Sequence, residues 1–76
     1  MGDDLANRIV MNPNICGGRP SVAGTRIRAS DIVEMVANGA TQAEILADFT
    51  ELTADDIRAA MLFAARSISH PVLRVA

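Results

Sequence analysis

Residues 17–28 read GGRPSVAGTRIR and bring three glycines and three arginines together in one short stretch. Glycine-rich loops bind phosphate when their spacing lets backbone N–H groups surround the anion, as in the pattern GxxxxGK[ST]. Here five residues separate Gly18 from Gly24, no lysine precedes Thr25, and Pro20 has no backbone N–H to donate. The spacing therefore argues against a phosphate-binding loop, and we expect these glycines at sharp turns between short strands.

Catalytic and metal-binding candidates are few. The single histidine, His70, stands in a Ser-His-Pro turn, and the single cysteine, Cys16, precedes two glycines with no evident histidine partner. Asp55 and Asp56 are adjacent where a helix is expected to start, and the helix dipole stabilises carboxylates there without any catalytic role. We therefore predict a protein that is not an enzyme and that has no metal, no cofactor and no small-molecule substrate.

The basic residues are all arginines, and charge is divided along the chain. Residues 5–30 contain four arginines and no acid, residues 31–57 contain seven acids and no base, and residues 58–76 contain three arginines. The planar donor group of arginine suits both phosphates and carboxylates. The candidate DNA-binding residues are the arginines of the first region: Arg8, Arg19, Arg26 and Arg28. A composition bias of the source genome explains the absence of lysine equally well.

Short β-prone runs precede the helical part of the chain. They cover residues 9–11, 20–22 and 25–28, and glycine or proline interrupts the sequence between them. Because side chains alternate along a strand, we expect Arg26 and Arg28 to point outward together from the last run. These runs predict a short N-terminal β-hairpin.

Helical patterning begins after this hairpin. Ser30 is expected to cap a helix that starts at Asp31, and Asn38 and Gly39 are expected to end it, because both residue types tolerate the left-handed conformation of a helix stop.

Two further helices begin at capping boxes, in which the first and fourth residues satisfy each other's backbone N–H groups. One box is formed by Thr41 and Glu44, and the other by Thr53 and Asp56. The second box opens a helix that we expect to run from residue 54 to about residue 67.

The centre of this last helix is apolar almost all round. A helix of that kind is normally covered on all sides, and in a chain this small nothing else can cover the second side. We therefore predict a homodimer with Leu62 and Phe63 near its interface.

The length and composition limit the number of domains and the possible cross-links. A chain of 76 residues makes one small domain, and a single cysteine excludes an internal disulfide. The predicted fold class is α+β, mostly α, as a single domain over residues 1–76: a β-hairpin segment at 8–29, a three-helix part at 30–69 and a short tail at 70–76. No apolar stretch is long enough to cross a membrane, and we expect a cytoplasmic protein.

The order of the helices resembles a helix-turn-helix, in which the last helix reads DNA. The charge of that helix argues against direct reading, because Asp55 and Asp56 stand at its start, where phosphates would meet carboxylates. The positive charge of Arg8, Arg19, Arg26 and Arg28 therefore suits the phosphates of DNA better than the start of the last helix does.

Most of the chain, from about Arg8 to Ala65, resembles a bacterial and archaeal family catalogued as domain of unknown function 433 and also described as VapB-like antitoxins. The resemblance rests on Pro13, Cys16-Gly17-Gly18, Pro20, Gly24-Thr25-Arg26-Ile27, Gly39, Glu44-Ile45-Leu46, Leu52-Thr53 and Asp56-Ile57. It implies a β-hairpin followed by a helix-turn-helix-like helical domain. It also implies an antitoxin of a type II toxin–antitoxin pair that binds and silences a PIN-like ribonuclease toxin and represses its own operon by binding operator DNA.

The last residues of the chain suggest how such a toxin would be bound. PIN-type nucleases hold metal ions with clustered carboxylates, and an arginine on an apolar segment can form charge-assisted bonds with them. The candidate toxin-binding residues are Leu73, Arg74 and Val75. Two alternatives stay open at this point: a terminus that contacts nothing, and a dimeric protein-protein interaction module with no DNA binding.

Overall fold

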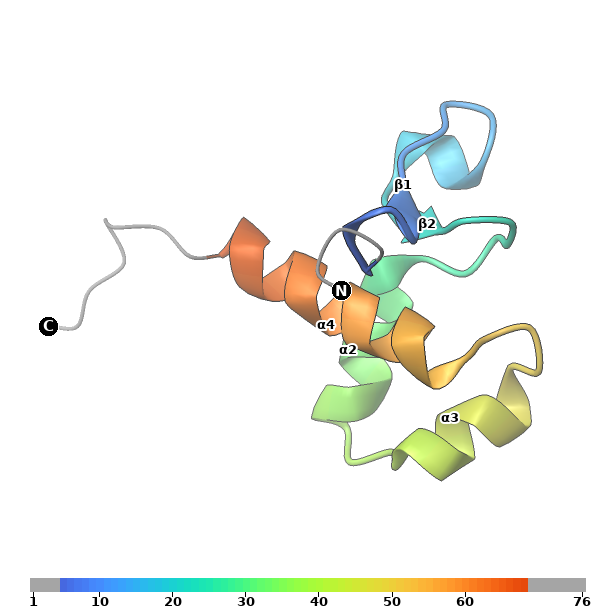
Figure 1. Cartoon of the computed structure of the whole chain (residues 1–76), viewed down its shortest axis with the longest axis vertical. Helices are drawn as coiled ribbons and strands as arrows, with labels where there is room; N and C mark the ends of the chain where they lie inside the picture. Colours follow the sequence, from blue (N-terminus) through green and yellow to red (C-terminus); the bar gives the residue numbers. More distant parts are fainter. Residues whose placement is uncertain (1–4, 69–76) are drawn as a thin grey trace, which may run out of the picture.

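The computed structural model describes residues 5–68 and places a small β-hairpin over three helices (Figure 1). The elements in chain order are β1 (Ile9–Val10), the 3₁₀ turn η1 (Cys16–Gly18), β2 (Ser21–Val22), α2 (Ala29–Ala37), α3 (Gln42–Asp48) and α4 (Ala54–Ser67). This order is the predicted α+β, mostly helical class. None of the helices in the described part is long and apolar enough to cross a membrane.

The hairpin pairs β1 with β2, which lie in the first two of the three predicted runs. Ile9 pairs with Val22 and Val10 with Ser21 in antiparallel register, and η1 lies in the connection. Gly17, Gly18 and Gly24 all have positive φ, between 64° and 84°, which confirms that these glycines serve turns.

The prediction of a strand over residues 25–28 is wrong. Thr25 closes a turn on Val22, because both its N–H and its hydroxyl bond the Val22 carbonyl, at 3.0 and 2.9 Å. The same hydroxyl accepts a bond from the Ile27 N–H at 3.0 Å. Only Arg28 makes a bridge, to Ser21, so Arg26 lies in a bend and the two arginines are not alternate residues of one strand.

The predicted start of α2 is also wrong. The helix begins at Ala29, its N-cap is Arg28, and no side chain caps it. Ala29 donates its N–H to the carbonyl of Pro20 at 2.9 Å, so the chain enters the helix directly from the bridge and Ser30 lies inside it. The predicted end is confirmed, with Asn38 as C-cap and Gly39 at a φ of 94°.

Both predicted capping boxes are formed. At α3, Glu44 accepts from the Thr41 N–H at 2.7 Å and donates its own N–H to the Thr41 hydroxyl at 3.1 Å. At α4, the corresponding bonds between Thr53 and Asp56 are 2.9 and 3.3 Å. Each box provides hydrogen-bond acceptors for N–H groups that a helix start otherwise leaves unpaired.

One core joins the hairpin to all three helices. α4 packs chiefly against α2, and β1 lies on another side of α4 (Figure 1). The buried core side chains are aliphatic: Val22, Ala29, Ile32, Ile45, Leu52, Ile57 and Ala60. The described residues thus share a single core, as expected of one small domain.

Candidate functional site

Arg8, the first candidate DNA-binding residue, is held by the start of α4. Its guanidinium lies 3.0 Å from Asp56 Oδ1 and 3.8 Å from Asp55 Oδ2. Asp56 is only 6% exposed, and its other oxygen, Oδ2, accepts the capping bond from Thr53. One carboxylate therefore closes the capping box and also ties the turn before β1 to α4, across 48 residues of sequence.

Arg28, the second candidate, is paired locally. Its Nε and Nη2 donate to the two oxygens of Asp31 at 3.2 and 3.0 Å. This hydrogen bond, together with the charge of Asp31, raises the pKa of Arg28. This forked pair directs Arg28 toward its own helix start and uses Nε and Nη2, so fewer of its N–H donors remain for phosphate.

Arg19 and Arg26 differ from the other two candidates. Both are exposed, and neither makes an ion pair with another described residue. The carbonyl of Arg26 accepts a bond from the Cys16 thiol at 3.1 Å, which holds the bend without using the guanidinium. The four arginines are therefore divided into two that bond carboxylates within the chain and two that face solvent.

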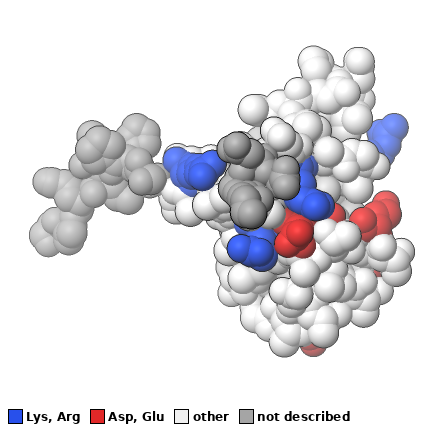
Figure 2. Space-filling model, viewed as in Figure 1, with Lys and Arg blue, Asp and Glu red and all other residues white. Residues whose placement is uncertain are grey.

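The charged groups do not form one basic surface on the face viewed in Figure 2. At the centre of this view arginine side chains lie directly beside acidic side chains, whereas the arginines at the left and at the upper right lie apart from them, and a largely uncharged area extends below. Arg58 belongs to the same mixed group, since it lies 3.6 Å from Asp55. Nearby carboxylates weaken the attraction that the arginines exert on phosphate.

The second side of α4 is partly covered by the chain itself. Leu62 lines two hollows between the N-terminal segment and α4. One holds about 420 Å³ and is also lined by Leu5, and the other holds about 60 Å³ and is also lined by Ala6, Ile9 and Phe63. The premise that nothing in the chain could cover this side is therefore wrong, because the segment before β1 folds back onto it. Leu62 is half-buried within one copy.

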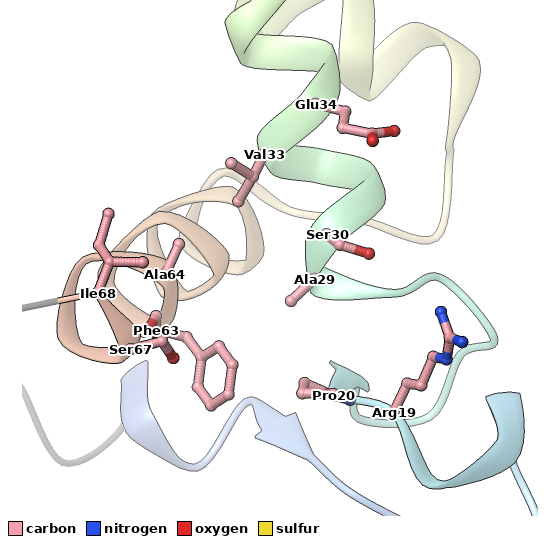
Figure 3. Close-up of a pocket in the computed structure, with 10 residues that line it drawn as sticks. All are labelled: Arg19, Pro20, Ala29, Ser30, Val33, Glu34, Phe63, Ala64, Ser67 and Ile68. Atoms are coloured by element: carbon pink, nitrogen blue, oxygen red, sulfur yellow. Dashed lines mark hydrogen bonds between the residues drawn. The ribbon is translucent and has the colours of Figure 1, made fainter.

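An apolar groove opens between α2 and α4, with a volume of about 450 Å³. Figure 3 shows the ring of Phe63 within it, between α4 and the loop before β2. The lining comes from three segments of the chain: Arg19, Pro20, Ala29, Ser30, Val33, Glu34, Phe63, Ala64, Ser67 and Ile68. Of the two predicted interface residues, Phe63 lines this groove and Leu62 does not, but both line the hollow beside Ala6 and Ile9.

The charged side chains of the groove lie at its rim. Arg19 comes from the loop before β2 and Glu34 from the middle of α2, and both lie on the side away from α4 (Figure 3). Neither makes an ion pair with a described residue. The groove is thus an apolar surface with one cation and one anion along a single edge, an arrangement suited to binding protein.

Within residues 5–68, no three histidine, cysteine or carboxylate side chains come close enough together to hold a metal ion. The candidate toxin-binding residues Leu73, Arg74 and Val75 lie outside the described residues, as does His70. Sequence reasoning missed both the groove and the pairing of Arg8 with Asp56. The capping pattern at Asp56 was visible in the sequence, but nothing near it in the chain indicates its distant partner.

Comparison with known proteins gives relatives without an assigned activity. The chain is 37% identical over 65 residues to the uncharacterized protein y4eO of Sinorhizobium fredii (strain NBRC 101917 / NGR234), covering 82% of this chain and 29% of that protein. Its fold matches the crystal structure of a DUF433 member protein from Anabaena variabilis with a TM-score of 0.74 and 32% identity, over 90% of this chain and 66% of that one. The chain thus spans less than a third of the first relative and about two thirds of the second.

A family model described as "Protein of unknown function (DUF433)" matches residues 9–64, which include the hairpin, α2, α3, most of α4 and most of the groove. The matched region ends within α4, just before Ser67 and Ile68 at the edge of the groove. The resemblance inferred from the glycine-rich turns and the capping patterns is thereby confirmed, and the chain belongs to the DUF433 family.

Proposed function

We propose that this chain is a non-catalytic protein-binding module of the antitoxin type, which binds and neutralises a PIN-like ribonuclease. The observation that carries the proposal is the use of the arginines: Arg8 and Arg28 bond carboxylates within the chain, whereas an apolar groove between α2 and α4 stays open. Apolar surface with few charged groups is the composition of protein interfaces. Surfaces that bind DNA are instead strongly positive.

The proposed contact with the nuclease lies after α4. Leu73, Arg74 and Val75 place one arginine among apolar neighbours, and a guanidinium can form paired bonds with the carboxylates that hold metal ions in such nucleases. In this proposal residues 73–75 follow the folded part in the sequence and contact the nuclease. Arg74 competes with the metal ions for the carboxylates of its active site.

The test uses a PIN-like nuclease encoded in the reading frame beside this chain. We expect the chain to form a stoichiometric complex with it and to suppress its cleavage of RNA. Arg74→Ala is expected to weaken inhibition roughly tenfold or more, because it removes a charge-assisted contact to the active site. The matched control is Arg66→Ala, an exposed arginine at the end of α4.

Two results would overturn the proposal. One is the absence of any complex between the nuclease and the chain. The other is equal inhibition by the chain and by a variant that lacks residues 71–76, which would exclude the proposed contact segment.

A second candidate function is operator binding for autoregulation. It is favoured by Arg19 and Arg26, which are exposed and make no ion pair with a described residue. Each phosphate contact that is lost should reduce the salt dependence of DNA binding by about one unit of slope. We therefore expect the double change of Arg19 and Arg26 to alanine to reduce the dependence of DNA binding on salt concentration. Arg28→Ala should change this dependence little, because Arg28 is already paired with Asp31. Absence of a mobility shift with the upstream DNA at low salt would exclude this candidate.

A further inference from the structure

The groove between α2 and α4 is a surface hollow of about 450 Å³, open to solvent rather than enclosed in the core. The hollow beside Leu5 and Leu62 has a similar volume, about 420 Å³, so the lining and the rim of the groove carry the argument and its volume does not. Val33, Phe63 and Ala64 give it an apolar lining, so its natural occupant is apolar.

The rim restricts which apolar partner fits. Arg19 and Glu34 lie along the edge away from α4, and each lacks an ion-pair partner among the described residues (Figure 3). A matching partner must bring a carboxylate to Arg19 and a cation to Glu34. In a two-fold interface the same patch meets itself, so Arg19 of each copy can face Glu34 of the other.

The edge of the groove formed by α4 carries an exposed apolar side chain, Ile68. Ile68 lines the groove and is 68% exposed, one of only two large apolar side chains in the described part with exposure that high. A groove and an exposed apolar side chain on the same face are complementary to a second copy of that face. We infer that the α2–α4 groove binds a second copy of this chain through reciprocal Arg19–Glu34 pairs, with Ile68 of each copy entering the groove of the other.

This inference does not require the antitoxin role. It assigns the groove to a second copy of the chain, so the contact proposed for the nuclease is the separate segment after α4. Of the two residues predicted at the interface, only Phe63 lines the groove, and it also lines the hollow that Leu62 shares with Ala6 and Ile9. The central prediction concerns charge reversal. Arg19→Glu places two carboxylates across each contact and Glu34→Arg places two guanidinium groups there, so each variant alone should raise the dissociation constant of the dimer about tenfold or more.

Sedimentation equilibrium of the full chain tests the inference. We expect the wild-type chain to reach twice the mass of one 8.0 kDa chain at about 100 μM, with both single variants shifted toward monomer. An equimolar mixture of Arg19→Glu and Glu34→Arg should recover the wild-type dimer, because a mixed dimer restores an opposite pair at both contacts. A repulsion confined to one chain would not be relieved by mixing.

The matched controls are Arg26→Glu and Glu51→Arg, which make the same charge changes at exposed positions outside the groove and should leave the dimer unchanged. Circular dichroism checks that all variants are folded. A wild-type chain that stays monomeric, or a dimer that neither single variant weakens, would overturn the inference. Native mass spectrometry that finds a small apolar molecule bound to a monomer would also overturn it.

Discussion

One side of α4 is partly covered by the chain, and the other side is open. On one side the segment before β1 covers Leu62, and Arg8 binds Asp56 at the start of the helix. On the other side Phe63 and Ala64 line an open groove whose rim charges make no ion pair with a described residue. A helix that is apolar on all sides can therefore use its surface in two ways. In α4 one side packs against the rest of the chain, and the other stays available for binding.

Asp56→Ala should have the largest effect on the covered side. It removes the capping acceptor of Thr53 and leaves the half-buried Arg8 without its closest carboxylate, so we expect the free energy of unfolding to fall by about 2–3 kcal/mol. Urea denaturation measures this. The neighbouring Asp55, with a side chain 52% exposed, is the control, and Asp55→Ala should cost less than about 0.5 kcal/mol. Equal losses in the two variants would contradict the role given to Asp56.

A matched pair of isoleucines compares the two sides directly. Ile9 is partly buried against the core, whereas Ile68 at the groove edge is exposed. Ile9→Ala should lower the free energy of unfolding by about 2 kcal/mol. Ile68→Ala should lower the stability of the monomer by less than about 0.5 kcal/mol while weakening association of the chain. Thermal unfolding and sedimentation report these two quantities, and a large loss of monomer stability from Ile68→Ala would remove the distinction between the sides.

Thr53→Ala tests how the covered side is built. Loss of an N-cap side chain costs about 1 kcal/mol. Because Thr53 and Asp56 form one box, the double variant should be destabilised by less than the sum of the single losses. Thr41→Ala, in the separate box of α3, provides the control, since its effect should add to that of Asp56→Ala. Additive effects for both pairs, measured by chemical denaturation, would show that the Thr53–Asp56 box does not act as one unit.

Arg28→Ala should have the smallest effect. Its pair with Asp31 lies at the surface, where a single ion pair contributes about 0–1 kcal/mol. We expect a change of less than about 0.5 kcal/mol by urea denaturation, and a smaller one at high salt. A loss as large as that of Asp56→Ala would mean that pairs close in sequence and pairs distant in sequence stabilise this fold equally.

The helices were predictable because their starts and stops depend on nearby residues. The boxes at Thr41 and Thr53 and the stop at Gly39 each involve groups within a few positions, so the sequence carries the whole interaction. The start of α2 was predicted incorrectly for the opposite reason, since the bond from Ala29 to Pro20 depends on the hairpin fold. The side-chain bonds of Thr25 likewise replaced the strand expected over residues 25–28.

The candidate site was less predictable than the helices. Arg26 is exposed as expected, whereas Arg28, expected to point outward with it, is partly buried and pairs with Asp31. The partner of Arg8 lies 48 residues away and is not visible as a local pattern. The apolar character of α4 correctly indicated surface beyond the needs of its contact with α2. It did not indicate which side the N-terminal segment would cover, because that depends on where the hairpin places Ile9.

The central claim is that the groove side of α4 binds protein while the covered side is structural. Methyl NMR of the full chain tests it most directly, from about 10 μM to about 500 μM, a range that spans weak self-association. The account predicts that the methyl signals of Val33 and Ile68 shift with concentration, while those of Ile9 and Ile57 stay fixed. Shifts centred on Ile9 and Ile57, or no shifts at any of these residues, would contradict it.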